Sequence, residues 1–280
     1  MKLENFFYKK TGEEKYAFES NKKVYKDLTK NSPKFFFLAG DNLPIEPLVT
    51  GAYEPHVRDL IDYSAACGNA DFLIDIGANI GDTTVPMALC TGMTGITIGF
   101  DPNPYVFKIL ETNASLNKDK YVIHPHRCAI SSTPQSFYYI SSEASFGNGA
   151  ISETRDSKHG KFVYDGMVEG IHLKTFLETK YASMIQKLSF IKIDTEGYDK
   201  EIIKSISDLI QAYKPVIVAE SFGKASEAAK IELFEVIKNN GYDIFYFADF
   251  DINATVVELK VAADLVHYSQ TINVYAVPKK

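Results

Sequence analysis

Short apolar segments alternate with amphipathic stretches from about residue 72 onward, and this rhythm constrains the fold more than any other feature. Apolar runs of about four to eight residues are typical of buried strands, and longer stretches with apolar residues at every third or fourth position are typical of helices. A regular alternation of the two predicts an α/β fold, in which a parallel sheet carries helices on both faces. Seven strands are expected, at 72–76, 95–100, 121–124, 188–193, 215–219, 242–247 and 271–277.

Three helices are predicted with recognisable ends. Between the second and third strands, Asn103 supplies an N-cap and Pro104 the first helical position. After the fourth strand, one helix places the apolar residues of 202–210 on a single face. A further helix at 230–240 is expected to end at Gly241, because glycine accepts the left-handed conformation that closes many helices.

Two parts of the chain do not follow this rhythm. Residues 1–50 are rich in Lys and contain Pro33, Pro44 and Pro47, and we interpret them as a short cap or an oligomer contact. They precede a single domain that we expect to span 51–280. Within it, 131–170 is rich in Ser and Gly and only weakly periodic. Connections of this length are usually functional, so we predict a flap over the substrate.

The most informative motif is Asp75-Ile-Gly77-Ala-Asn79-Ile-Gly81-Asp82, where a strand ends in a carboxylate and opens through glycines into a helix. Glycines at such a turn let the backbone approach a nucleotide-like ligand closely. A dinucleotide site favours Gly-x-Gly-x-x-Gly, because pyrophosphate lies against a helix N-terminus with no side chain between them. Here the third glycine position holds Asp82, whose carboxylate would repel phosphates. The motif therefore favours a ligand without phosphates, such as S-adenosylmethionine.

A second carboxylate, Asp101, closes the next strand in the segment Gly-Phe-Asp101-Pro-Asn103-Pro. An acidic side chain at this position can accept hydrogen bonds from both hydroxyls of a ribose. The same segment is also ordinary turn chemistry before a helix. Because the glycine turn lies one strand earlier, we favour ribose binding.

Two further carboxylates, Asp194 and Glu196, follow the fourth strand in Lys-Ile-Asp-Thr-Glu-Gly-Tyr. In open α/β sheets the ligand crevice lies outside the carboxyl ends of the strands, so we expect both side chains to face the crevice of Asp75 and Asp101. They could take a proton from a hydroxyl nucleophile or bind a hard cation. The alternative, which we prefer for Asp199, is an acidic first turn that complements the helix dipole.

These three motifs resemble the FkbM family of S-adenosylmethionine-dependent methyltransferases, over about residues 51–277. Further similar segments are Gly51-Ala52-Tyr53-Glu54, Asn113, Cys128-Ala129-Ile130-Ser131 and Val218-Ala219-Glu220. The resemblance implies a Rossmann-like, seven-stranded sheet whose last strand is antiparallel. It also implies methyl transfer to a hydroxyl, often on a sugar or a polyketide.

The resemblance assigns cofactor contacts to individual residues. By the family's pattern, the methionine end is lined by Asp75, Gly77, Asn79 and Gly81, the ribose is held by Asp101, and the adenine lies near Cys128, Ala129 and Ile130. Glu54, Asn103 and Asp194 complete the cofactor-binding candidates. The family more often has Glu at the ribose position, one methylene longer than Asp101. It also tends to have Thr-Leu-Asp where this chain has Thr175-Phe-Leu177, so no role is assigned there.

Methyl transfer from a sulfonium is an in-line displacement, so the enzyme must position the hydroxyl and remove its proton. The catalytic candidates are Asp194, Glu196, Glu220 and His172. Asp194 and Glu196 would also suit Mg²⁺ or Ca²⁺. Two carboxylates alone do not make a metal site, so the metal stays unknown and none is predicted.

Composition and charge exclude several other classes of function. The formal net charge of -6 offers no overall field for nucleic acid. No apolar segment approaches the roughly 20 residues that span a bilayer, and the first residues do not form a secretory signal. Three widely spaced cysteines offer neither a disulfide framework nor a Cys-x-x-Cys metal site, which favours the cytoplasm.

The sequence therefore predicts a cytoplasmic O-methyltransferase that uses S-adenosylmethionine. Its acceptor is expected to be a hydroxyl of a small molecule or glycan precursor, and a homo-oligomer is compatible with the cap segment. One alternative is an NAD-dependent oxidoreductase on the same fold. Another is a non-catalytic nucleotide-binding subunit.

Overall fold

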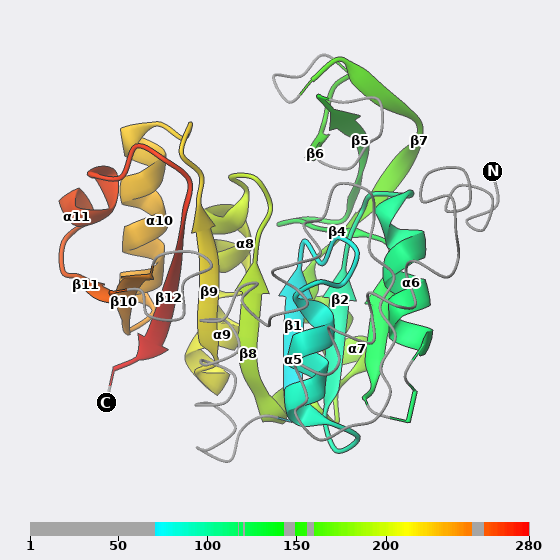
Figure 1. The fold of residues 1–280 in the computed structure, drawn as a ribbon. Helices are drawn as coiled ribbons and strands as arrows, with labels where there is room; N and C mark the ends of the chain where they lie inside the picture. The colour runs from blue at the N-terminus through cyan, green and yellow to red at the C-terminus, as the bar shows by residue number, and fades with distance from the viewer. Residues whose placement is uncertain are drawn as a thin grey trace.

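The computed structural model describes residues 71–116, 118–119, 121–142, 149–155, 160–247 and 255–279. Within these ranges the chain forms an α/β fold with one large sheet and one small sheet (Figure 1). The expected cap at 1–50, the segment that contains Glu54 and residues 146–148 of the insert lie outside the described residues.

The large sheet has the strand order β11-β10-β12-β9-β8-β1-β2-β3. The strands are β1 (Phe72–Ile76), β2 (Ile96–Phe100), β3 (Ile123–His126), β8 (Leu188–Ile193), β9 (Val216–Ser221), β10 (Tyr242–Phe247), β11 (Val257–Leu259) and β12 (Ile272–Pro278). β1 pairs in parallel with β2 and β8, whereas β12 runs antiparallel to β9 and β10. The seven expected strands and the antiparallel last strand are confirmed, but the strand count is corrected to eight by β11, which is only three residues long.

Helices cover both faces of the large sheet (Figure 1). They are α5 (Thr84–Thr91), α6 (Val106–Leu116), α7 (Leu173–Lys180), α8 (Asp199–Ser205), α9 (Ser207–Tyr213), α10 (Glu227–Asn239) and α11 (Ala262–Val266), with a 3₁₀ turn at Ile185–Lys187. α5 and α6 pack on one face, and α7 to α11 pack on the other. None of the helices in the described ranges is long and apolar enough to cross a membrane.

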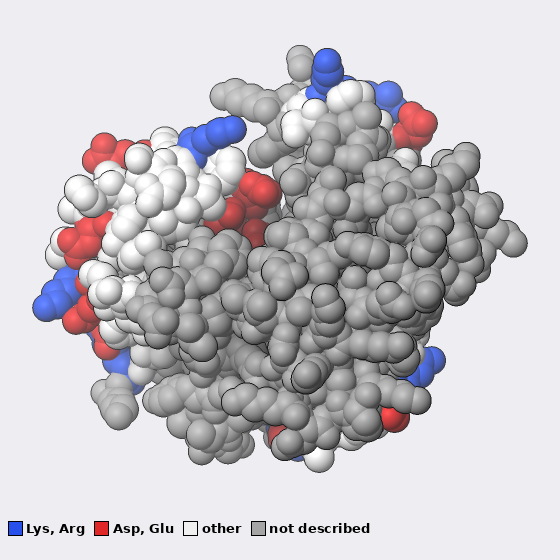
Figure 2. All heavy atoms as spheres, viewed as in Figure 1, with Lys and Arg blue, Asp and Glu red and all other residues white. Residues whose placement is uncertain are grey.

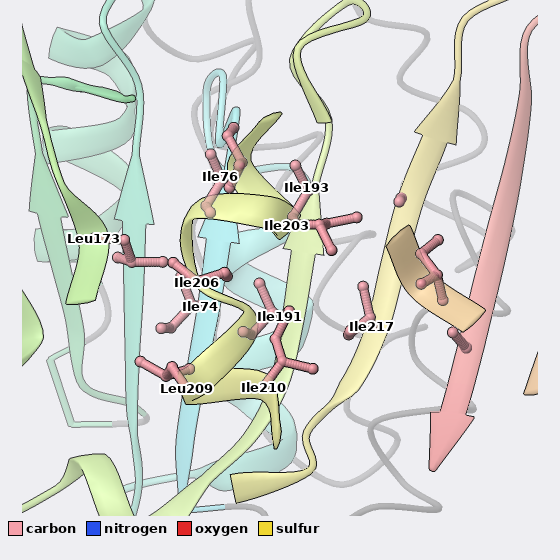
Figure 3. Close-up of a cluster of buried hydrophobic side chains, with 14 of the residues drawn as sticks. Ile74, Ile76, Leu173, Ile191, Ile193, Ile203, Ile206, Leu209, Ile210 and Ile217 are labelled. Atoms are coloured by element: carbon pink, nitrogen blue, oxygen red, sulfur yellow. The ribbon is translucent and has the colours of Figure 1, made fainter. Parts of the chain in front are cut away.

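The larger core lies between the sheet and α7 to α11. Figure 3 shows Ile74 and Ile191, from neighbouring strands, directed toward Ile203, Leu209 and other residues of these helices. These isoleucines are fully buried, and each contributes about 1.5–3 kcal/mol through removal of its side chain from water. Burial of this extent fixes the strand ends on which the site is built.

Two helix predictions can be compared with the structure. The Asn103 cap is present, because its Oδ1 accepts a hydrogen bond from the backbone N–H of Tyr105 at 2.9 Å. The expected single helix over 202–210 is wrong, since α8 and α9 are separate helices that meet at Ile206. Ile206 has φ -117° and ψ 17°, outside helical geometry, yet it stays fully buried. The apolar pattern therefore continues across a break that it does not reveal.

The small sheet is formed by four strands in the order β4-β7-β5-β6. They are β4 (Ala129–Ile130), β5 (Gln135–Ser141), β6 (Ala150–Ser152) and β7 (Phe162–Ile171). β5 pairs antiparallel with β6 and β7, and β4 pairs in parallel with β7. The described part of 131–170 is thus a folded sheet that rises beyond the carboxyl ends of β1 and β2 (Figure 1).

Candidate functional site

A cavity of about 270 Å³ lies at the carboxyl ends of the central parallel strands. Its wall is built from the loops after β1, β2 and β8, from the end of β9, and from the strands β4, β5 and β6 of the small sheet. The volume is near the lower limit of sites for small ligands, about 300 Å³. Acidic side chains gather in a recess on this face of the molecule, close to the position of α8 in Figure 1 (Figure 2).

The glycine turn after β1 brings the backbone against β8. Gly77 has φ +82°, and a Cβ atom there would lie 1.9 Å from the carbonyl oxygen of Asp194. No side chain fits in this space, so the position requires glycine. Two later residues of the turn are fixed from outside it: the N–H of Ala78 donates to the carbonyl of Phe100 at 3.0 Å, and the Asn113 amide donates to the carbonyl of Ile80 at 2.7 Å.

Asp75 supports the turn from behind the cavity wall. Its carboxyl group is fully buried, and its Oδ2 accepts a 2.6 Å hydrogen bond from the hydroxyl of Thr84 at the start of α5. Burial raises the pKa of Asp75, and the nearby ammonium of Lys192 opposes that rise. Asp75 and Gly81 do not line the cavity, whereas Gly77 and Asn79 do.

Asp101 lies on the cavity wall with its carboxylate fixed by two backbone donors. Oδ2 accepts from the N–H of Asn79 at 2.8 Å, and Oδ1 accepts from the N–H of Asn103 at 2.8 Å. Asn79 reaches this position with φ +47°, a conformation that Asn tolerates better than most residues. Burial raises the pKa of Asp101 to about 7, although both hydrogen bonds favour the charged form. The result is an acceptor with a fixed direction beside the glycine turn.

The wall next to Asp101 is largely apolar. It includes Cys128, Ala129 and Ile130, which the sequence placed near an adenine. Burial raises the pKa of the Cys128 thiol to about 12, so this group remains neutral and is a packing surface rather than a nucleophile. An apolar wall formed by these three residues suits an aromatic base.

Two further strands of the small sheet, β5 and β6, also contribute residues to the cavity wall. Tyr139, on β5, lines the cavity and accepts a 3.1 Å hydrogen bond from the Asn103 amide. Ala150 and Ile151, on β6, also face the cavity. The role of this insert as a flap over the substrate stays a prediction. The run of three aromatic residues in β5 was the available signal, and on its own it resembles ordinary sheet packing.

The other end of the cavity is acidic. Asp194, Glu196 and Glu220 line it, and Lys192 lies among them. The Nζ atom of Lys192 is 3.2 Å from Oδ2 of Asp194. Asp199 lies behind the wall, where it joins the two strand ends: Oδ1 accepts from the N–H of Glu220 at 2.9 Å, and Oδ2 accepts from a neighbouring hydroxyl. As expected, Asp199 begins α8.

Burial and mutual repulsion favour the neutral forms of these acids. The pKa of Glu220 is raised to about 9, first by burial and then by the charges of Asp194 and Glu196. Burial likewise raises the pKa of Asp199 to about 7 and also raises the pKa of Glu196. At neutral pH Glu220 is therefore protonated, so it can donate a hydrogen bond but does not act as a base.

Two sequence candidates are not brought into this cavity. His172 caps α7, where its Nδ1 lies 3.1 Å from Oγ1 of Thr175, and its Nε2 lies 3.1 Å from the carbonyl oxygen of Ser205. It does not line the cavity. Glu54 lies outside the described residues. Conversely, sequence reasoning gave no role to Lys192, although a charged residue inside an otherwise apolar strand was a visible signal.

Across the residues that the structure describes, no three or more His, Cys, Asp or Glu side chains are arranged to hold a metal ion.

Most of the chain that forms this site matches a known protein family. Residues 75–244 match the model of the methyltransferase FkbM domain, and this span is more than half of the chain. The chain belongs to the FkbM methyltransferase family. The resemblance inferred from the three motifs is thus confirmed. No curated protein matches the sequence significantly.

Solved structures similar to this FkbM-family chain have low sequence identity to it. The FkbM methyltransferase of Methylobacillus flagellatus is 13% identical, with a TM-score of 0.46 over 83% of this chain and 52% of that one. The O-methyltransferase of Bacillus cereus, solved with S-adenosylhomocysteine, is 11% identical, with a TM-score of 0.45 over 98% and 100%. Magnesium protoporphyrin IX methyltransferase of Synechocystis, solved with S-adenosylmethionine, is 11% identical, with a TM-score of 0.40 over 100% and 98%.

Proposed function

We propose that this FkbM-family chain is an S-adenosylmethionine-dependent O-methyltransferase whose acceptor is a hydroxyl of a sugar or glycan precursor. The observation that carries the cofactor assignment is the carboxylate of Asp101, held by two backbone N–H groups beside the Gly77 turn in a methyltransferase family. The choice of a sugar hydroxyl follows the resemblance to the family. A cytoplasmic location and a homo-oligomer stay predictions.

The donor set of the cavity fits S-adenosylmethionine. Each carboxylate oxygen of Asp101 accepts one backbone hydrogen bond and keeps capacity for a ribose hydroxyl. The apolar wall at Cys128 to Ile130 suits the adenine, and the carboxylates at the other end suit a sulfonium and an ammonium group. Asp82 lines the cavity where a dinucleotide would place pyrophosphate, which disfavours NAD.

The bound cofactor would supply an electrophilic methyl group, and the side chains at the acidic end would prepare the acceptor. We assign removal of the hydroxyl proton to Asp194 and Glu196, which both line the cavity. Burial raises the pKa of Glu196, which makes its ionised form a stronger base than an ordinary glutamate. Glu220, neutral at pH 7, is placed to donate a hydrogen bond to an acceptor oxygen. His172 receives no catalytic role.

Titration calorimetry of the full chain with S-adenosylhomocysteine tests the cofactor assignment. NAD is the control ligand, and each titration is repeated with Mg²⁺. We expect a dissociation constant on the order of micromolar for S-adenosylhomocysteine, equivalent to about -8 kcal/mol, and no heat with NAD. Asp101→Ala should abolish the first signal. Binding of NAD alone would overturn the proposal and favour the oxidoreductase alternative.

Transfer of a labelled methyl group from S-adenosylmethionine tests the reaction. A panel of neutral sugars, amino sugars and glycans is screened as acceptors with the wild-type chain and with the double variant Asp194→Asn, Glu196→Gln. The wild type should label one class of hydroxyl, and the double variant should lose transfer while keeping its melting temperature. Full transfer by the double variant would show that the proton acceptor is elsewhere. Binding of the cofactor without transfer to any acceptor would favour the non-catalytic alternative.

A further inference from the structure

We propose that Lys192 is a positioning residue, whose buried ammonium holds the carboxylate of Asp194 in place on the cavity wall. This inference deepens the proposed function and rests on it, because Lys192 would act through a carboxylate that we assign to methyl transfer.

The register of the sheet places Lys192 between two carboxylates. β1 and β8 run in parallel, and Asp75 is the direct partner of Lys192 across the pair. The Nζ atom of Lys192 lies 3.8 Å from Oδ1 of Asp75 and 3.2 Å from Oδ2 of Asp194, two residues further along. Asp75 is in turn fixed by Thr84 at the start of α5. A continuous path of polar contacts thus runs from the sheet interior to the cavity.

Exposure differs sharply along this path. The Asp75 side chain is 0% exposed and that of Lys192 is 5% exposed, whereas that of Asp194 is 34% exposed. The path is therefore buried at Asp75, and it ends at the partly exposed carboxylate of Asp194, which lines the cavity. This is the arrangement of a support that holds a reacting group at a set position.

Stability alone does not explain a lysine here. Moving an ammonium and a carboxylate out of water is so unfavourable that apolar residues of similar size are often as stable as a buried ion pair. On the same face of β8, two residues before Lys192, Phe190 is fully buried in an apolar cluster, so an apolar residue would match the strand. A charge retained at this position therefore points to a role in the site.

The surrounding charges explain what the ammonium would do. Four acidic side chains lie near Asp194: Asp75 on β1, Glu220 on β9, Glu196 in the loop before α8, and Asp199 at the start of α8. Like charges in a partly buried site repel one another and favour protonated forms. Lys192 opposes this effect, because it lowers the pKa of both Asp75 and Glu220. It also gives the Asp194 side chain a fixed partner.

A double-mutant cycle separates positioning from a purely structural role. Lys192→Met, Asp194→Asn and the double variant are compared with the wild type for affinity toward S-adenosylhomocysteine and for free energy of unfolding. If Lys192 acts through Asp194, each single variant should weaken binding by about tenfold to a hundredfold, and the double variant should bind no more weakly than the weaker single variant. Lys192→Gln, which retains a donor, serves if the Met variant does not fold.

Lys230 provides a matched control. It is also buried, and its Nζ donates to the carbonyl of Tyr268 at 2.6 Å, away from the cavity. Lys230→Met should lower stability yet leave affinity unchanged, and its effects should add to those of Asp194→Asn.

The outcomes of the cycle are distinguishable from failure of the proposed function. Additive losses of affinity for Lys192→Met and Asp194→Asn, in a wild type that binds S-adenosylhomocysteine, would overturn the positioning role. If the wild type does not bind S-adenosylhomocysteine, the proposed function is overturned. The cycle in the free energy of unfolding then still tests the coupling between Lys192 and Asp194.

Discussion

Gly77 and Asp194 are in backbone contact: a Cβ atom at Gly77 would lie 1.9 Å from the carbonyl oxygen of Asp194. The contact exists because the N–H of Asp194 donates to the carbonyl of Ile76 at 2.9 Å, which extends the pairing of β1 and β8 one step past the strand ends. The glycine turn and the acidic end of the cavity are thus in direct contact. A substitution in either one should therefore disturb the geometry of both.

Gly77→Ala should therefore remove cofactor binding and destabilise the fold. Its positive φ costs an alanine about 1–2 kcal/mol, and the clash with Asp194 adds to that cost. Gly241→Ala is the matched control, because Gly241 has φ +84° but its Cβ would come no closer than 3.7 Å to any atom, the nearest being Nζ of Lys214. Urea unfolding and calorimetry with S-adenosylhomocysteine measure both effects. Equal losses of stability for the two variants would show that the contact with Asp194 does not matter.

Binding of S-adenosylhomocysteine should weaken as the pH falls below about 7. The pKa of Asp101 is about 7, and the ribose hydroxyls need the ionised carboxylate as acceptor. Below this pH the carboxyl group must release a proton on binding, so affinity should fall by up to about tenfold per pH unit. Above it, affinity should be constant. Calorimetry between pH 5.5 and 8.5 gives the profile.

The variant Asp101→Asn tests whether Asp101 is the group responsible for that pH dependence. The test is needed because the pKa of Asp199 is also about 7. The Asn side chain has only one acceptor oxygen, so the N–H of Asn79 or of Asn103 loses its partner, at a cost of about 1–3 kcal/mol. We expect weaker binding with a flat profile over this pH range. A variant that keeps the wild-type profile would place the titrating group at another residue.

Much of the site was accessible from the sequence because its parts lie at strand ends. The topological rule that ligands bind outside the carboxyl ends of parallel strands predicts that Asp101, Asp194 and Glu196 lie together. The pairing of Lys192 with Asp75 was not accessible, since the register between strands 117 residues apart depends on tertiary packing. The small sheet was missed for a related reason, because β5 and β7 pair across residues that carry only weak periodicity.

Glu220→Gln should stabilise the protein, increasingly so as the pH rises. The pKa of Glu220 is about 9 in the folded chain, against an ordinary value of 4.5. Between these values the folded state retains a proton that the unfolded state has lost, so the free energy of unfolding of the wild type falls with rising pH. The amide removes this contribution, and these two pKa values give a gain of up to about 4–5 kcal/mol at pH 8 and about 1 kcal/mol at pH 5. Thermal unfolding at both pH values measures it.

The exposed residue Glu227, at the start of α10, provides the control for that measurement. Glu227→Gln removes one negative charge without changing a buried group, so its stability relative to wild type should not vary with pH. If Glu220→Gln behaves in the same way as Glu227→Gln, Glu220 is ionised in the folded protein, and its assignment as a hydrogen-bond donor is wrong.

His172→Ala should weaken the fold and leave the cavity intact. The imidazole accepts from the backbone N–H of Thr175 at the start of α7 and links this helix to the carbonyl of Ser205 at the end of α8. Loss of a cap of this kind costs about 1 kcal/mol. Because His172 does not line the cavity, affinity for S-adenosylhomocysteine should change by less than about twofold, a difference under 0.5 kcal/mol. A large loss of binding or of methyl transfer at unchanged stability would return His172 to the catalytic candidates, and it would mean that α7 moves toward the cavity when the ligand binds.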